Sequence, residues 1–133
     1  MSTLVTLTYD ATENVVFISF PEPTTLRTNE EIAGYFAQVV SFWRKRCLGK
    51  KAYFVVDFDN IVIDMTCMDF YAKQSKAAHE ECAIASVRYG GDPLQRTAAR
   101  LAGMKMHRAS NICESRAEAL AMVRAMKEAA QNE

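Results

Sequence analysis

Alternating apolar and polar residues near the start of the chain predict a β-hairpin. Residues 4–9 alternate with the period of a strand, and residues 15–20 form a second run rich in β-branched and aromatic side chains. The polar residues 10–14 between them include Asp and Asn, which favour turns. Pro21 and Pro23 are expected to end the second strand, because proline cannot donate a hydrogen bond to a strand ladder.

A helical pattern follows the hairpin. Thr28 and Glu31 have the spacing of a capping box, in which the hydroxyl accepts from a backbone N–H and the carboxylate reaches back. Apolar residues then recur every three or four positions, which predicts an amphipathic helix that ends near Gly49. Its expected buried face comprises Ile32, Tyr35, Phe36, Val39, Val40 and Trp43.

Strands and helices alternate through the rest of the chain. The continuous apolar run over residues 52–58 predicts a strand buried on both faces of a sheet. Later elements are expected as a helix over about 66–80, a strand over 82–87, a helix over 92–103, a short strand within 104–112 and a terminal helix that begins at Ser115. This order predicts one α/β domain over residues 1–133, with a mostly parallel sheet.

Composition and charge exclude several classes of function. Sixteen basic residues balance sixteen acidic residues, whereas proteins that bind nucleic acid usually carry a basic excess. No apolar stretch reaches the roughly 18 residues that a membrane span needs, and the first residues do not resemble a signal peptide, so a cytoplasmic location is expected. The four cysteines form no C-x-x-C pair, so neither a metal site nor any other cofactor is expected.

Carboxylates and a hydroxyl cluster where the apolar strand over residues 52–58 gives way to the next helix. Asp57, Asp59 and Asp64 are followed by Thr66 at the expected helix start. Ligands and partners of α/β folds gather at this end of the strands. Two interpretations of the cluster are open: Thr66 is a site of modification that a partner senses, or Thr66 or Asp64 simply caps the helix.

Two segments resemble the small STAS domains, a family named for sulfate transporters and anti-sigma-factor antagonists. Residues 55–58 and 61–66 resemble the family's strand, loop and Asp-Ser-Ser-Gly helix start. Residues 92–96 through 101–104 resemble a later helix of the family, with an arginine near its start and a Leu-x-Gly-Leu-like end. The length and the order of the elements agree over nearly the whole chain.

The resemblance implies a fold and a function. The implied fold is a mixed, mostly parallel β-sheet with an N-terminal hairpin and about four helices packed mainly on one face. The implied function is that of a non-catalytic regulator, which binds an anti-sigma-factor-like, kinase-like or other signalling protein and is controlled by phosphorylation. In the family's motif the phosphoacceptor is the second hydroxyl residue after the aspartate, a position that Thr66 fills. The chain departs from the motif at Met65, which replaces the first serine, and at Cys67, which replaces the glycine.

Phosphate on Thr66 would add roughly −1.5 to −2 charges at a helix start, next to acidic residues. We therefore expect a partner-binding surface around Thr66 that uses side chains of both charges. The expected partner-binding residues are Asp59, Asp64, Asp69, Lys73, Lys76 and Arg96. The opening hairpin also leaves a strand edge at which a second copy of the chain could pair, so a homodimer is a further expectation.

Two other classes of function compete with this one. The first is a transport-associated or accessory module of the same fold that binds a lipid or small molecule without phosphorylation. The second is a small phosphohydrolase in which Asp57 attacks phosphorus and Asp59 acts as acid and base. The sequence lacks the later acidic pair that would hold Mg²⁺ for that chemistry. A thiol enzyme using Cys67 would need His79 or His107 as base, and His79 lies several turns further along the same helix.

Overall fold

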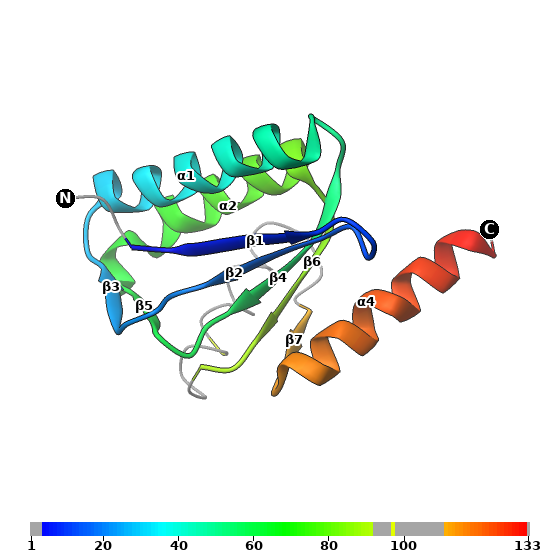
Figure 1. The fold of residues 1–133 in the computed structure, drawn as a ribbon. Coiled ribbons are helices and arrows are strands. Elements are labelled where there is room, and N and C mark those ends of the chain that lie inside the picture. The colour runs from blue at the N-terminus through cyan, green and yellow to red at the C-terminus, as the bar shows by residue number, and fades with distance from the viewer. Residues whose placement is uncertain (1–3, 92–96, 98–110, 133) are drawn as a thin grey trace.

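A five-stranded β-sheet crosses the molecule and has helices on both of its faces (Figure 1). The computed structural model describes residues 4–91, 97 and 111–132. The sheet contains β1 (Thr6–Asp10), β2 (Val15–Ser19), β4 (Ala52–Asp57), β6 (Ala83–Tyr89) and β7 (Ile112–Cys113), in the order β1-β2-β4-β6-β7. Strand β1 is antiparallel to β2, and every other neighbouring pair in this sheet is parallel. The predicted hairpin and mostly parallel sheet are therefore confirmed.

A second, two-stranded sheet lies at one end of the molecule. It pairs β3 (Thr24–Leu26) in parallel with β5 (Ile61–Ile63). The sequence did not predict these strands, because three residues are too few for a period-two pattern to stand out. The Asn60 side chain connects the small sheet to the main one by donating a hydrogen bond of 2.9 Å to the carbonyl of Phe20.

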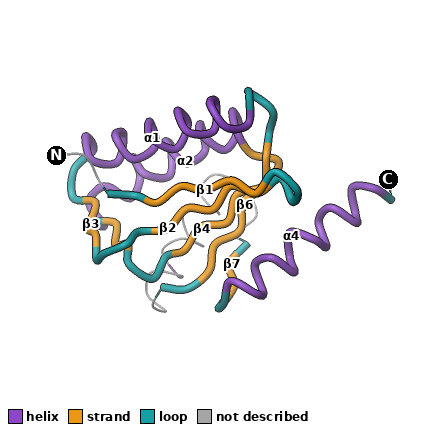
Figure 2. Tube along the Cα trace, in the orientation of Figure 1, coloured by secondary structure: helices purple, strands orange, loops and turns teal. Residues whose placement is uncertain are grey.

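Three described helices form the outer layers, which Figure 2 distinguishes from the strands by colour. They are α1 (Asn29–Cys47), α2 (Met68–Cys82) and α4 (Arg116–Gln131). Helices α1 and α2 lie side by side on one face of the sheet, and α4 covers the other face along β4, β6 and β7 (Figures 1 and 2). Two of the three thus share a face, as the fold prediction expects. The helix predicted over residues 92–103 lies outside the described part of the chain, apart from Thr97.

Two apolar clusters fill the space between the sheet and the helices. Alternate residues of one strand point to opposite faces, so Phe54 joins the cluster under α1 and α2 while its neighbour Val55 joins the cluster under α4. Both side chains are buried. The continuous apolar run in β4 is therefore explained by burial on both faces, as predicted.

The cap of α1 satisfies backbone groups much as the sequence indicates. The Thr28 hydroxyl accepts from the backbone N–H of Glu31 at 3.1 Å. The Glu31 carboxylate reaches back one residue further than a standard capping box and accepts from the N–H of Arg27 at 3.2 Å. At the other end of the helix, the Trp43 indole donates to the carbonyl of Lys50 at 2.9 Å. No helix in the described residues is long and apolar enough to cross a membrane.

Candidate functional site

Thr66 lies in a single 3-10 turn, η1 (Met65–Cys67), which connects strand β5 to helix α2. One carboxylate oxygen of Asp64 accepts two hydrogen bonds from Thr66, from the backbone N–H at 2.9 Å and from the hydroxyl at 2.7 Å. These two bonds lower the pKa of Asp64, because they favour its ionised form, and the Arg27 guanidinium acts in the same direction. Asp64 is therefore the residue that caps the turn, and the exposed Thr66 donates its hydroxyl to that cap.

Two hydrogen bonds fix the turn against the strand that leads into α1. The backbone N–H of Asp64 donates to the carbonyl of Leu26 at 2.9 Å, and the Cys67 thiol donates to the carbonyl of Arg27 at 3.3 Å. Cys67 is buried. The residue that stands in place of the STAS glycine thus points into the core, so its bulk does not block the surface above Thr66.

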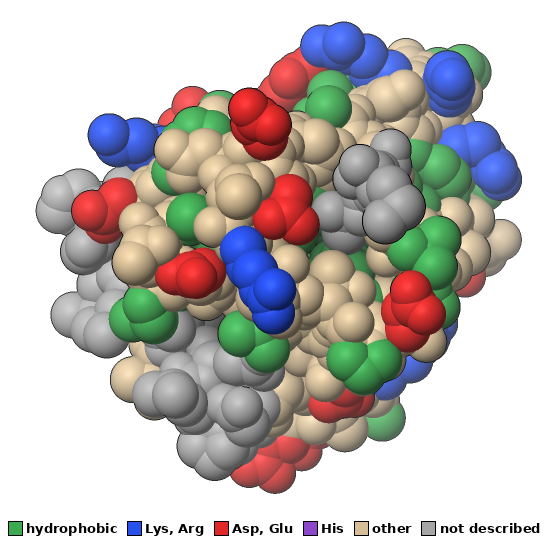
Figure 3. Space-filling view, turned by 90° about the vertical axis from the view of Figure 1, so that its left-hand side faces the viewer, with side chains coloured by type: hydrophobic (Ala, Val, Ile, Leu, Met, Phe, Trp, Pro, Cys, Tyr) green, Lys and Arg blue, Asp and Glu red, His purple; other side chains and the backbone are tan. Residues whose placement is uncertain are grey.

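Exposed apolar side chains flank the Thr66 turn. Met65 is 68% exposed and Val62 in β5 is 46% exposed. In the view of the molecule's end that carries β3 and β5, acidic side chains lie around a central basic one (Figure 3). The turn therefore belongs to a surface that mixes apolar and charged groups, as the core and rim of many protein-binding surfaces do.

The residues predicted along the second helix share one exposed face of α2. Asp69, Lys73 and Lys76 are all exposed, and their spacing of four and three residues places them on the same side of the helix. The Lys76 ammonium lies 3.9 Å from the Glu80 carboxylate, a surface pair that contributes little to stability. These side chains thus extend the surface from the Thr66 turn along α2.

Asp59 belongs to a different arrangement. Its carboxylate accepts a hydrogen bond of 2.9 Å from the backbone N–H of Gly91, beyond the end of β6. The N–H of Asp59 in turn donates to the Asp57 carboxylate at 2.8 Å. The exposed Asp59 therefore stabilises the loops at the ends of β4 and β6. Arg96, the last predicted contact, lies outside the described residues.

Solved structures with the same arrangement of strands and helices connect this geometry to a known fold. An anti-sigma factor antagonist from Mycobacterium paratuberculosis is similar over 93% of this chain and 99% of its own, with 15% sequence identity and a TM-score of 0.58. The Bacillus cell fate determinant SpoIIAA, in its phosphorylated form, is similar over 90% of this chain and 98% of its own, with 12% identity and a TM-score of 0.55. The chain has the STAS fold. No family model and no curated protein matches the sequence itself.

In this STAS fold, the carboxylates considered for phosphohydrolase chemistry are held by the backbone of the loops. Asp57 accepts from the N–H of Asp59, and Asp59 accepts from Gly91. Within the described residues, no three His, Cys, Asp or Glu side chains lie close enough to hold a metal ion. Cys67 donates to a backbone carbonyl, and burial of its side chain separates it from solvent. His107 lies outside the described residues.

The structure also shows a buried charged residue that the sequence did not indicate, Arg88. Arg88 in β6 is buried, with 8% of its surface exposed, and it lines a cavity beneath α1 and α2. The predicted strand stopped at residue 87, one position short of this arginine. Arg88 directly follows Val87, so extending the predicted strand by two residues to Tyr89 would have placed Arg88 in the sheet.

Proposed function

We propose that this STAS domain is a non-catalytic regulatory protein that binds a protein partner through the surface around Thr66, and that phosphorylation of Thr66 controls binding. The observation that carries the proposal is the exposed Thr66 hydroxyl, which is hydrogen-bonded to Asp64 at 2.7 Å at the start of η1. A kinase can reach this oxygen without unfolding the domain, because Cys67 and the backbone hold the turn from beneath.

Phosphorylation of Thr66 would change its attraction to Asp64 into repulsion. The hydroxyl hydrogen that Asp64 now accepts would be replaced by a phosphoryl group of roughly −1.5 to −2 charges. That group would be repelled by the ionised carboxylate of Asp64. It would be attracted by the positive end of the α2 dipole and by the Arg27 guanidinium, which already helps to lower the pKa of Asp64. The surface would become strongly acidic, and an acidic partner would be released.

The proposed partner surface has an apolar centre and a charged rim. Met65 and Val62 would supply the apolar contacts, which usually dominate the binding free energy. The charged rim would comprise Asp64, Asp69, Lys73 and Lys76, together with Asp59. Arg96 stays a predicted contact that lies outside the described residues. Charges at a rim act mainly on the association rate and on the choice of partner.

The two similar structures support a signalling protein as the partner, because proteins with one fold can share a mode of regulation. One is an anti-sigma factor antagonist and the other was captured in a phosphorylated form. By this analogy, the partner is a protein of the anti-sigma-factor or kinase-like type, or another signalling protein, in the cytoplasm.

Affinity capture from native lysate, with mass spectrometry of the captured proteins and of Thr66 itself, tests the proposal. The baits are the wild type, Thr66→Ala, Thr66→Glu and the control Thr12→Glu, which adds the same charge in the hairpin turn at the opposite end of the sheet (Figure 1). We expect Thr66→Glu to lose a partner that the wild type, Thr66→Ala and Thr12→Glu all retain.

Two results would contradict the regulatory proposal. If all four baits capture the same proteins equally and Thr66 carries no phosphate, the threonine serves only the turn. If instead Thr66→Glu loses no partner and the purified wild type carries a co-purifying lipid or small molecule, visible as a mass above that of the polypeptide in native mass spectrometry, an accessory ligand-binding module becomes the better description.

A further inference from the structure

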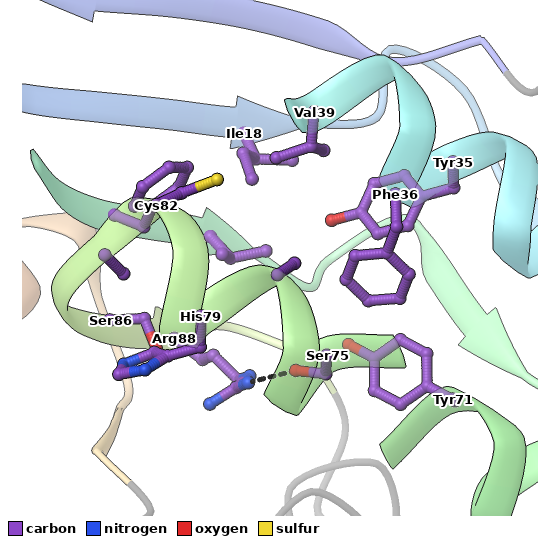
Figure 4. Close-up of a pocket in the computed structure, with 14 residues that line it drawn as sticks. Ile18, Tyr35, Phe36, Val39, Tyr71, Ser75, His79, Cys82, Ser86 and Arg88 are labelled. Atoms are coloured by element: carbon purple, nitrogen blue, oxygen red, sulfur yellow. Dashed lines mark hydrogen bonds between the residues drawn. The ribbon is translucent and has the colours of Figure 1, made fainter. Parts of the chain in front are cut away.

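A cavity lies between helices α1 and α2 and the main sheet (Figure 4). Its volume is about 50 Å³, which is room for roughly three to five water-sized groups. Most of its lining is aliphatic or aromatic, with side chains from β2, α1, β4 and α2. Such cavities are normally dry unless polar groups face them.

Buried polar groups of Arg88, Ser75 and Tyr35 face this cavity. Arg88 is 8% exposed, and its guanidinium reaches the Ser75 hydroxyl at a long 3.5 Å and lies 5.9 Å from the centre of the Phe58 ring. Tyr35 is 4% exposed, and its hydroxyl has no hydrogen-bond partner in the described part of the chain. Figure 4 shows the Tyr35 ring directed from α1 toward the other lining residues, and Arg88 beneath α2 beside Ser75.

Arg88 is a charged residue buried beside a mostly apolar cavity, which is uncommon in proteins. A guanidinium is always charged and carries five donors, and a buried charge is tolerated when a counter-charge or several hydrogen bonds compensate it. No carboxylate lies within ion-pair distance of Arg88 in residues 4–91, 97 and 111–132. Among the described residues, the guanidinium of Arg88 has one hydrogen-bond partner, the Ser75 hydroxyl. Most of its five donors can therefore bind an anion.

We propose that the cavity binds a small monocarboxylate with a short apolar tail. A carboxylate matches the planar fork of Arg88 with two parallel hydrogen bonds. The Tyr35 hydroxyl can donate to the same anion, since burial raises the pKa of Tyr35 far above its usual value and keeps its phenol protonated. The apolar tail then contacts the hydrophobic lining, which includes Ile18, Val39 and Val56.

A surface groove lies next to the cavity, between the two helices. The groove, of about 280 Å³, follows α1 and α2, and several of its lining residues are alanines. Phe36 and Ala78 line both the groove and the cavity, and both are only half-buried. Displacement of the Phe36 ring would join the two spaces. This site is on the inner side of the helices and is independent of the proposed role of Thr66.

Calorimetric unfolding of the full chain with propionate tests this proposal. Propionamide has the same shape without the charge and serves as the matched ligand, and sodium chloride equalises the ionic strength. We expect propionate at ten times its dissociation constant to raise the Tm by roughly 4 °C and propionamide to have no effect. Arg88→Met should abolish the rise, whereas Arg116→Met, which removes the guanidinium stacked on Phe17 under the opposite face, should retain it.

A second variant covers the case in which Arg88→Met fails to fold. Tyr35→Phe removes one hydroxyl from the cavity while it keeps the ring, and we expect it to weaken propionate binding roughly 3–10-fold. A crystal structure grown with propionate should show the carboxylate against Arg88. Equal Tm shifts with propionate and propionamide, an undiminished shift in Arg88→Met, or a crystal structure that holds water alone in the cavity would each overturn the proposal.

Discussion

The Asp59 carboxylate occupies the space where a side chain on residue 90 would begin. A Cβ atom built on Gly90 would clash with Oδ1 of Asp59 and lie 2.8 Å from its Cγ. Gly90 also has a φ of +75°, a conformation that L residues rarely adopt. The absence of a side chain at residue 90 thus allows Asp59 to reach the backbone N–H of Gly91.

Gly90→Ala should destabilise the protein. We expect the free energy of unfolding to fall by about 1–3 kcal/mol, because the substitution combines backbone strain with the loss of the Asp59 hydrogen bond. Urea denaturation followed by Trp43 fluorescence measures the change. Gly34→Ala is the matched control: it lies in α1 with no atom within 4 Å of the added Cβ, so it should stabilise by about 0.5–1 kcal/mol. Equal effects of the two substitutions would contradict this account of Gly90.

Valine-to-alanine substitutions at two positions separate the core from the proposed partner surface. Val123 in α4 is 1% exposed and Val62 in β5 is 46% exposed. Val123→Ala should reduce the free energy of unfolding by about 2 kcal/mol, because it leaves a cavity beneath α4. Val62→Ala should change stability by less than about 0.5 kcal/mol and weaken capture of the Thr66 partner. A Val62→Ala protein that binds normally would remove Val62 from the proposed surface.

The cap that Asp64 provides for the Thr66 turn should make stability depend on pH in the acid range. The pKa of Asp64 is lowered in the folded state by the two hydrogen bonds from Thr66. Its contribution to stability is therefore complete above the unfolded-state pKa, near 4, and is lost as the pH falls through the lower folded-state pKa. We expect Asp64→Ala to unfold at lower urea concentrations than the wild type at pH 7, and the difference between the two proteins to shrink as the pH falls below about 4. A constant difference across this range would show that Asp64 acts without its charge.

Burial of Cys82 should make the protein less stable in alkali. Burial, and to a smaller extent the charge of Glu81, raises the pKa of this thiol from 9.0 to about 11. Between these two values the unfolded chain loses the thiol proton while the folded chain keeps it, so stability falls as the pH rises. Cys82→Ala should reduce the decline of the urea midpoint between pH 9 and 11. If the substitution leaves the decline unchanged, other groups such as Tyr35 account for it.

The long elements of the fold could be predicted from the sequence because each carries its own periodic signal. The capping residues Thr28 and Ser115 both accept from the residue three positions on, as their spacing indicates. The run in β4 is buried throughout up to Val56. Strands β3 and β5 could not be predicted, because their stability comes from pairing with each other rather than from a local pattern. Phe36 and Val40 were expected inside but are half-buried, since they lie at the edge of the stripe that meets the sheet.

The candidate site was predictable in part. The sequence placed Asp64 and Thr66 together, and the structure shows which of them caps the turn. The sequence could not show that Asp59 bonds to Gly91, because that contact joins residues 32 positions apart. Arg88 was missed for a similar reason: its burial depends on the helices that cover β6, and a charged residue alone gives no sign of such cover.

The segment that leads into α1 is bonded to the segment that leads into α2. The bonds are main-chain hydrogen bonds: those between β3 and β5, and the one from Asp64 to Leu26. These bonds do not depend on which side chains the segments carry. Val62, Met65 and Thr66 can therefore be exchanged while both helices keep their starting points. Related proteins can therefore keep this backbone arrangement while the side chains of the proposed partner surface change. The sequence of that surface should diverge faster than the rest of the domain.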